Sequence, residues 1–237
     1  IDVNHVAQLM NKNVKAIICV HYGGLPCDMD ELQNIADKWS VPIIEDAAQA
    51  VGAKYKGSTI GSISDFTMFS FQAIKHITTG DGGMLIVKNK ELIDQAERVR
   101  WFGIDRNAKQ AGIWENDITE IGYKYQMTDI AAAMGIASLQ EFDAVSSLRK
   151  RLFKVYSDEL AGYDRVKIIG NDFDDREHAA WLFTIIVDNR YKLQEKLRDN
   201  KIESNQVHFR NDRYSIFKDF TEGKNFPNIC LLYTSPS

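Results

Sequence analysis

Two stretches of the chain decide its fold: VPIIEDAAQA (residues 41–50) and FTMFSFQAIKHITTGDGGMLIV (66–87). The first opens with an apolar run, and the second both opens and closes with one. Continuous apolar runs of this kind are typical of strands that are buried on both faces of a parallel sheet. We therefore predict strands over 41–46, 66–71 and 83–88.

The sequence around these runs continues the alternation of strand and helix patterns. The run AIICVH (16–21) predicts a further buried strand, and apolar residues recur at helical spacing over 28–39 and 91–103. Buried strands that alternate with amphipathic helices favour an α/β fold, in which helices cover both faces of a mostly parallel sheet. Ligands usually bind at the carboxyl ends of the strands in such folds.

The pattern changes in the second half of the chain. A long helical stretch covers 127–163, with a break expected near Gly135 or Phe142. Strand, strand, helix and strand patterns follow in VKIIG, WLFTIIVD, YKLQEKLRDN and IESNQVHF. This order predicts part of a small α+β domain over 141–237, attached to a large domain over 1–140.

The amino-acid composition limits the kinds of binding partner that we expect for this chain. The hydrophobic content of 44% and charged content of 26% are ordinary for a soluble globular protein. The net charge of -4 gives no electrostatic reason to expect nucleic acid or an anionic membrane as a partner. No apolar stretch reaches the ~18 residues that span a bilayer. The three cysteines are an odd and sparse set for a chain of this length, which predicts reduced thiols in a cytoplasmic protein rather than a disulfide framework. No pair of them has zinc-ligand spacing, so we expect no metal site.

Lys75 and Asp46 point to a particular chemistry. Asp46 ends one predicted strand, and Lys75 follows another, 29 positions later. A lysine amine forms a Schiff base with the aldehyde of pyridoxal phosphate (PLP), and a carboxylate keeps the pyridine nitrogen protonated so that the ring withdraws electrons. Each residue alone is more often a surface charge or a turn residue, so the prediction depends on the whole set.

Other polar residues near the predicted strand ends extend this set. Ser70 is placed to hydrogen-bond a phosphate near the amine, and Gln49 is a candidate partner of the ring's phenolic oxygen. His21, at the end of the first predicted strand, is a candidate substrate-binding residue. The glycine-rich segment 78–83 matches neither nucleotide-binding glycine motif, and predicts a tight turn close to the lysine.

Three segments, in their order and spacing, resemble a known family: IIEDAAQAVGAKYKG, SDFTMFSFQAIKHITTGDGGM and IGYKYQMTDIAAAMG. They look like the DegT/DnrJ/EryC1/StrS family of fold-type-I PLP-dependent aminotransferases, which act on nucleotide-linked keto sugars. The similarity extends from about Val14 to Arg210. It implies that residues 1–140 are the later portion of the PLP-binding large domain.

The resemblance assigns roles to matching positions. Lys75 resembles the lysine that holds the cofactor, and Asp46 resembles the partner of the pyridine nitrogen. Gln49 matches the residue beside the ring hydroxyl, and Ser70 matches a phosphate ligand. Some relatives carry His in place of this lysine and catalyse dehydration, so the presence of Lys75 favours transamination.

The resemblance also implies a homodimer with each active site at the subunit interface. Lys124 falls where many members have an Asn that reaches the partner's cofactor phosphate, and a lysine there would meet the phosphate as a point charge. His208 matches a residue that faces substrate in many relatives. Arg210 is a candidate for recognising a nucleotide phosphate or, alternatively, for local salt bridges only.

The expected function is PLP-dependent transamination of a nucleotide-linked keto sugar, with glutamate as the amino donor. The alternative is a non-catalytic or regulatory relative that keeps the fold as a binding module; the loss of Asn at position 124 favours it and the retained cofactor set argues against it. The chain begins without Met and ends in CLLYTSPS, which does not match the family. We therefore expect a piece of a longer protein, and no measurable turnover for residues 1–237 alone.

Overall fold

The computed structural model describes residues 1–115, 117–208 and 211–223. The chain divides into two units. The first unit contains Val3–Lys150 and Asp174–Trp181, and the second contains Arg151–Phe173 and the residues from Leu182 on. The division therefore falls ten residues beyond the expected boundary at 140, and the return of Asp174–Trp181 to the first unit was not expected.

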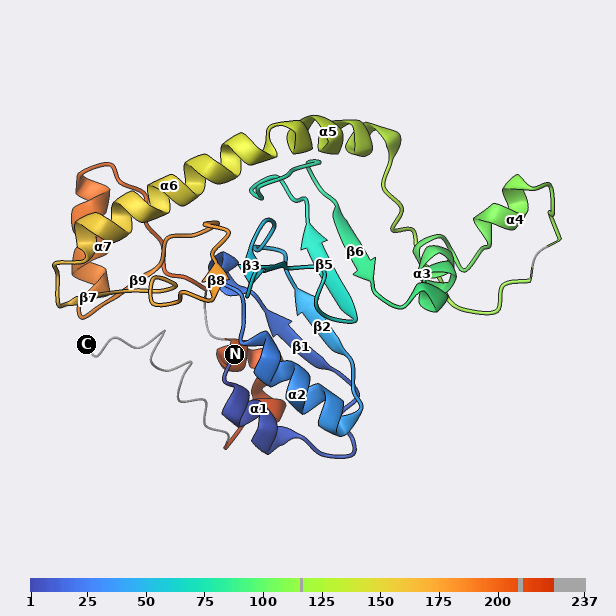
Figure 1. Cartoon of the computed structure of the whole chain (residues 1–237), viewed down its shortest axis with the longest axis horizontal. Coiled ribbons are helices and arrows are strands. Elements are labelled where there is room, and N and C mark those ends of the chain that lie inside the picture. The colour runs from blue at the N-terminus through green and yellow to red at the C-terminus, as the bar shows by residue number, and fades with distance from the viewer. Residues whose placement is uncertain (116, 209–210, 224–237) are drawn as a thin grey trace. The chain divides into compact units, whose positions relative to one another are not determined.

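A four-stranded sheet forms the centre of the first unit (Figure 1). Its strands, in spatial order, are β1 (Ile17–Val20), β2 (Ile43–Asp46), β5 (Phe66–Ser70) and β6 (Gly83–Val87). The pairs β1–β2 and β2–β5 are parallel, as expected, whereas β6 runs antiparallel to β5. A parallel neighbour needs a crossover, usually a helix, and the segment between β5 and β6 forms a closed loop instead.

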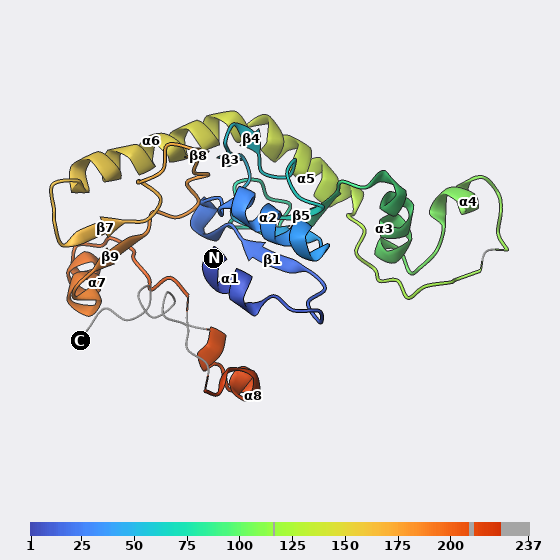
Figure 2. The ribbon, with the colours of Figure 1, turned by 60° about the horizontal axis from the view of Figure 1, so that its bottom comes forward.

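Helix α2 (Met29–Trp39) covers one face of this sheet with the apolar stripe expected from the sequence. Met29, Leu32 and Ala36 are buried against strand residues that include Ile17 and Ile43. Full burial of a side chain such as Leu32 stabilises the fold by about 1.5–3 kcal/mol. Helix α1 (Val3–Leu9) lies beside α2 in both views (Figures 1 and 2).

A second, three-stranded sheet brings a distant segment into the first unit. Its order is β4 (Ser58–Thr59), β3 (Lys54–Tyr55) and β8 (Arg176–Glu177), all antiparallel. The buried guanidinium of Arg176 donates to the Pro26 carbonyl at 2.9 Å and to the Asp28 carboxylate at 2.8 Å. These charge-assisted hydrogen bonds attach β8 to the start of α2.

The long helical stretch expected over 127–163 forms two helices, α5 (Asp129–Gln140) and α6 (Phe142–Leu160). The break lies at Glu141, beside one of the two expected positions, while Gly135 lies inside α5. Before them come three shorter helices: η2 (Lys90–Leu92), α3 (Ile93–Arg100) and α4 (Arg106–Gln110).

The second unit contains an antiparallel pair of strands, a helix and three short helical segments. They are β7 (Val166–Ile168), β9 (Ile185–Val187), α7 (Arg190–Asp199), η3 (Asn211–Arg213), η4 (Ser215–Phe217) and α8 (Lys218–Thr221). The strand predicted over IESNQVHF is absent from 202–208, which are irregular with a bend at Val207. This run has no β-paired neighbour among the described residues to satisfy its backbone groups.

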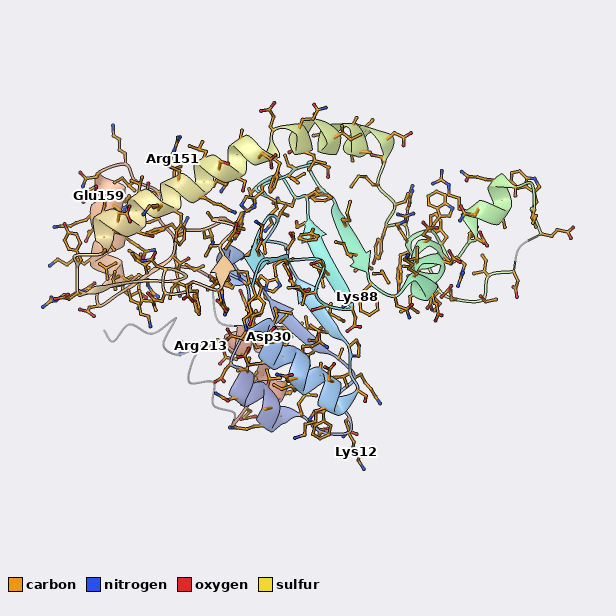
Figure 3. All side chains as sticks on the ribbon, in the orientation of Figure 1. Lys12, Asp30, Lys88, Arg151, Glu159 and Arg213 are labelled. Carbon is orange, nitrogen blue, oxygen red and sulfur yellow. The ribbon has the colours of Figure 1, made fainter. Side chains whose placement is uncertain are left out.

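Charged side chains mark the surface of the first unit, as the labelled Lys12, Asp30 and Lys88 illustrate (Figure 3). Within the part of the chain that the structure describes, no helix combines the length and apolar character needed to cross a bilayer.

Candidate active site

Lys75 lies in a loop that closes on itself between β5 and β6. At the base of the loop, the Thr79 N–H donates to the Phe71 carbonyl at 2.9 Å, and the Phe71 N–H donates to the Gly82 carbonyl at 2.8 Å. A Cβ atom at Gly82, whose φ is +157°, would lie 2.4 Å from the Thr79 hydroxyl. The predicted glycine-rich turn therefore closes the loop that carries the lysine.

Asp46 ends β2, between the carboxyl ends of β1 and β5. Its Oδ1 accepts a hydrogen bond from the Ala48 N–H at 3.0 Å, which fixes the turn after the strand. Burial lowers the pKa of Lys75, and the charge of Asp46 opposes this by raising it. The charge of Asp46 thus acts on the Lys75 amine, although no hydrogen bond or ion pair joins the two groups among the described contacts.

Gln49 is oriented by the loop after β1. The Gly23 N–H, in the short helix η1 (Tyr22–Gly24), donates to Gln49 Oε1 at 2.6 Å. Because an N–H can only meet the oxygen end of the amide, the NH₂ group of Gln49 remains as the donor end. A donor is what a phenolic oxygen of a cofactor would need at this position.

Ser70 is the last residue of β5 and is half-buried. Its hydroxyl oxygen accepts a hydrogen bond from the Gln72 N–H at 3.3 Å. The hydroxyl proton can still donate to a second group, so Ser70 can keep this local contact and bind a phosphate oxygen.

Trp181 contacts Lys75 and was not among the residues expected from the sequence. The Lys75 amine lies 4.0 Å from the centroid of its ring, and its indole N–H donates to the Ile74 carbonyl at 3.2 Å. Trp181 opens a run that the sequence analysis assigned to the small domain. No local signal could have found the contact, because it depends on the return of the chain through β8.

His21 is in the core rather than facing a substrate. It is fully buried; its Nδ1 accepts from the Cys27 N–H at 3.1 Å, and its Nε2–H donates to Glu45 at 2.7 Å. An Nδ1 that accepts carries no proton, so this arrangement holds a neutral imidazole. Both ring nitrogens are used, and the expectation that His21 binds substrate is wrong.

Glu45, which precedes Asp46, is the centre of this buried network. It also accepts from the Thr67 hydroxyl at 3.0 Å and from the Ser64 N–H at 3.2 Å. Burial alone would raise the pKa of Glu45, but the hydrogen bonds from its partners hold the pKa below its usual value. The network joins β1, β2 and β5 directly beneath the strand end that carries Asp46.

Replacing Glu45 with glutamine is expected to lower the free energy of unfolding by about 2–3 kcal/mol, since charge-assisted hydrogen bonds are lost. The depressed pKa means that the stabilisation is complete above the unfolded-state value of 4.5 and disappears as the pH falls through the folded-state value. Urea unfolding of both proteins should therefore give a difference that shrinks at acidic pH. Glu31→Gln, an exposed position in α2, is the control; equal losses in both variants would contradict the prediction.

The remaining candidates are not brought together with Lys75 by the described contacts. Lys124 is exposed in the first unit and pairs through its backbone with Trp101. His208 belongs to the second unit, where it is exposed with a φ of +47°. Arg210 lies outside the described residues. The roles of these three residues stay predictions.

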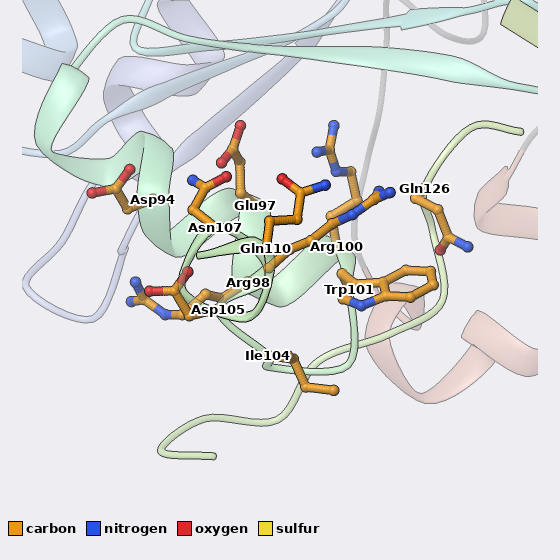
Figure 4. A pocket seen from close by; sticks show the side chains of 11 residues that line it. Asp94, Glu97, Arg98, Arg100, Trp101, Ile104, Asp105, Asn107, Gln110 and Gln126 are labelled. Carbon is orange, nitrogen blue, oxygen red and sulfur yellow. The ribbon is translucent and has the colours of Figure 1, made fainter. Parts of the chain in front are cut away.

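A separate hollow of about 430 Å³ lies around α3 and α4 (Figure 4). Its lining includes three arginines, three carboxylates and Trp101, over whose ring the Arg106 guanidinium lies at 5.6 Å. None of the candidate site residues lines it. Because arginines and carboxylates are mixed in the lining, the hollow favours neither sign of ligand charge.

Comparison with solved structures defines the class of protein. The chain matches the sugar aminotransferase CalS13 from Micromonospora echinospora with a TM-score of 0.90 at 30% identity, over 98% of this chain and 64% of that one. It matches the PMP form of Spr1654 from Streptococcus pneumoniae with a TM-score of 0.85 at 29% identity, over 98% and 65%. The fold is the α/β fold of the PLP-dependent sugar aminotransferases.

Sequence comparison then gives the family. The chain belongs to the DegT/DnrJ/EryC1/StrS aminotransferase family, whose sequence model matches residues 1–232. It is 34% identical over 211 residues to GDP-perosamine synthase from Escherichia coli O157:H7, which covers 88% of this chain. The chain spans 56% of the length of that relative.

Proposed function

We propose that the protein containing this chain is a PLP-dependent aminotransferase, which transfers the amino group of glutamate to the keto carbon of a nucleotide-linked sugar. The observation that supports the proposal is that Asp46 ends β2, Lys75 lies in the loop after the neighbouring strand β5, and the charge of Asp46 acts on the Lys75 amine. The similarity to GDP-perosamine synthase supports the substrate class.

The residues around Lys75 fit the cofactor. Lys75 would hold the aldehyde carbon, and Asp46 would face the pyridine nitrogen. The NH₂ group of Gln49 would donate to the ring hydroxyl, and Ser70 would donate to the phosphate. Bound PLP supplies an electron sink that stabilises negative charge on the carbon atom bearing the amino group.

Lys75 has the properties of a general acid and base. Burial lowers the pKa of its amine, so a larger neutral fraction exists near physiological pH than for a solvent-exposed lysine. The neutral amine would take the proton from the α-carbon of glutamate and pass it to the aldehyde carbon of the bound cofactor. In the second half-reaction it would take that proton back and give it to the former keto carbon of the sugar. Asp46 would lie next to the ring nitrogen.

We also infer a cytoplasmic homodimer, in which Lys124 of one subunit binds the cofactor phosphate held by the other, and His208 and Arg210 contact the nucleotide-linked substrate. Exposed apolar side chains between α4 and the end of α5 support the dimer, including Trp114, Ile121 and Ile130, which are 75%, 82% and 78% exposed. Burying such side chains favours association. A sedimentation experiment in which the protein stays monomeric at micromolar concentration would contradict the dimer.

The direct test is an assay of the two half-reactions. We expect the purified full-length protein that contains this chain, supplied with PLP, to form 2-oxoglutarate from glutamate in an amount equal to the number of sites. Adding a nucleotide-linked 3- or 4-keto sugar should convert this single event into continuous turnover, with an amino sugar detected by mass spectrometry. Binding of PLP without formation of 2-oxoglutarate would instead support the non-catalytic alternative.

A further inference from the structure

Trp181 makes two interactions with the segment that carries Lys75. The indole N–H donates to the Ile74 carbonyl, one residue before Lys75, and this hydrogen bond fixes the plane of the ring. The Lys75 amine then lies 4.0 Å from the ring centroid, within the range of a cation–π interaction. The contact is therefore defined both at the edge of the ring and at its face.

The segment that presents Trp181 is itself held in place. The Ala179 N–H donates to the Gly24 carbonyl at 2.9 Å, and the Ala179 carbonyl accepts from His76 Nε2 at 2.9 Å. Between Ala179 and Trp181, Ala180 is buried with a φ of +56°. A non-glycine residue in this region costs roughly 1–3 kcal/mol, and such strain is kept where the surrounding contacts determine the conformation.

The indole ring has two opposing effects on the protonation of the Lys75 amine. The indole face attracts the ammonium form, whereas burial beneath the ring favours the neutral amine. Other charges also face this region: Asp46 raises the pKa of Lys75, and Lys75, Arg149 and Lys150 lower the pKa of His76. An aliphatic side chain in its place would remove the attraction while still covering part of the amine.

We propose that Trp181 is a positioning residue for Lys75: its indole face holds the amine beside Asp46 whenever the amine is not bound to the cofactor. The inference rests on the proposed function, in which the Lys75 amine must be free of the cofactor while it moves protons in each half-reaction. The displaced amine then needs a defined position from which it can reach the α-carbon. Trp181 supplies that position because its plane is fixed by Ile74 and its segment is fixed by Gly24 and His76.

The test measures Lys75 without the cofactor, so that its failure is distinct from failure of the proposed function. Trace acetylation over a pH series from ~7 to ~11, which spans the ordinary lysine pKa, gives the titration of individual lysines by mass spectrometry. The exposed Lys12 in the same digest is the internal reference. The variants are Trp181→Leu and Trp181→Phe, with Trp39→Leu, at the end of α2, as the matched control.

We expect Trp181→Leu to lower the pKa of Lys75 by roughly half a unit to one unit, because the attraction is lost while an apolar side chain still covers the amine. Trp181→Phe should lie between the wild type and Trp181→Leu, because it keeps a weaker face but loses the hydrogen bond to Ile74. Trp39→Leu should leave Lys75 unchanged.

A purely structural role for Trp181 predicts the opposite sign. A smaller leucine that merely opens the site to water would relieve the burial and raise the pKa of Lys75. An unchanged or raised pKa in Trp181→Leu would therefore overturn the proposal. If that variant does not fold, an unchanged or raised pKa in Trp181→Phe has the same consequence. Failure of the wild type to bind PLP would end the proposed function but leave this measurement intact.

Discussion

The turnover number of the protein is expected to fall at least about a thousandfold when Lys75 is replaced with alanine, because the proton-transferring amine is lost. The same change removes the only nitrogen we assign to hold the cofactor covalently. Borohydride reduction of the protein with PLP should therefore attach a phosphopyridoxyl group to the wild type at Lys75 and to no residue of the variant. Mass spectrometry of the digest measures this directly.

Lys75→Arg tests whether the charge of the lysine alone is sufficient for activity. It keeps a positive charge beside Asp46, but a guanidinium stays protonated and cannot accept the proton. Its activity should be as low as that of Lys75→Ala, and Lys38→Arg on the surface of α2 should behave as the wild type. Substantial activity in Lys75→Arg would show that the lysine acts only through its charge, and would remove it from the proposed role.

The second large loss of activity is expected when Asp46 is replaced. Asparagine keeps the oxygen that accepts from the Ala48 N–H but removes the negative charge. Asp46→Asn should therefore fold normally and lower the turnover number by about a hundredfold to a thousandfold, the range found when one preorganised electrostatic group is removed from an active site. Steady-state kinetics and urea unfolding of the same preparation separate the two properties.

Asp46→Ala distinguishes this role from an ordinary turn residue. Alanine removes both the charge and the acceptor for Ala48, so it should add a loss of stability to the loss of activity. If Asp46 served the turn alone, asparagine would be nearly neutral and only alanine would have an effect. Full activity in a well-folded Asp46→Asn protein would thus refute the assignment.

Most of the fold of the first unit could be predicted because its signals are local. The runs that became β1, β2 and β5 are continuous and apolar, and α2 shows the expected stripe of Met29, Leu32 and Ala36. The predicted turn after Lys75 depends on glycine conformations that are readable from composition. Position near a predicted strand end made Asp46, Gln49 and Ser70 candidates, and the resemblance to a known family assigned their roles.

The incorrect predictions concern features that cannot be read from a local sequence pattern. His21 has the same strand-end position as Asp46, yet its ring points into the core, where Cys27 and Glu45 occupy both nitrogens. The alternation of side chains along a strand decides which face each residue meets, and a continuous apolar run hides that alternation. The antiparallel direction of β6 depends on a loop that returns beside β5, and the sequence shows only that a turn is present.

The order of strands and helices, the place of the lysine after a strand and the family to which the chain belongs were all determined by the amino-acid sequence. Only the tertiary structure decided that β8 returns to the first unit and lays Trp181 against Lys75. The physical reason is distance along the chain: Lys75 and Trp181 are brought together by Arg176 and by the Gly24 and His76 hydrogen bonds. Such contacts depend on how distant segments pack, which the local pattern of apolar and polar residues does not encode.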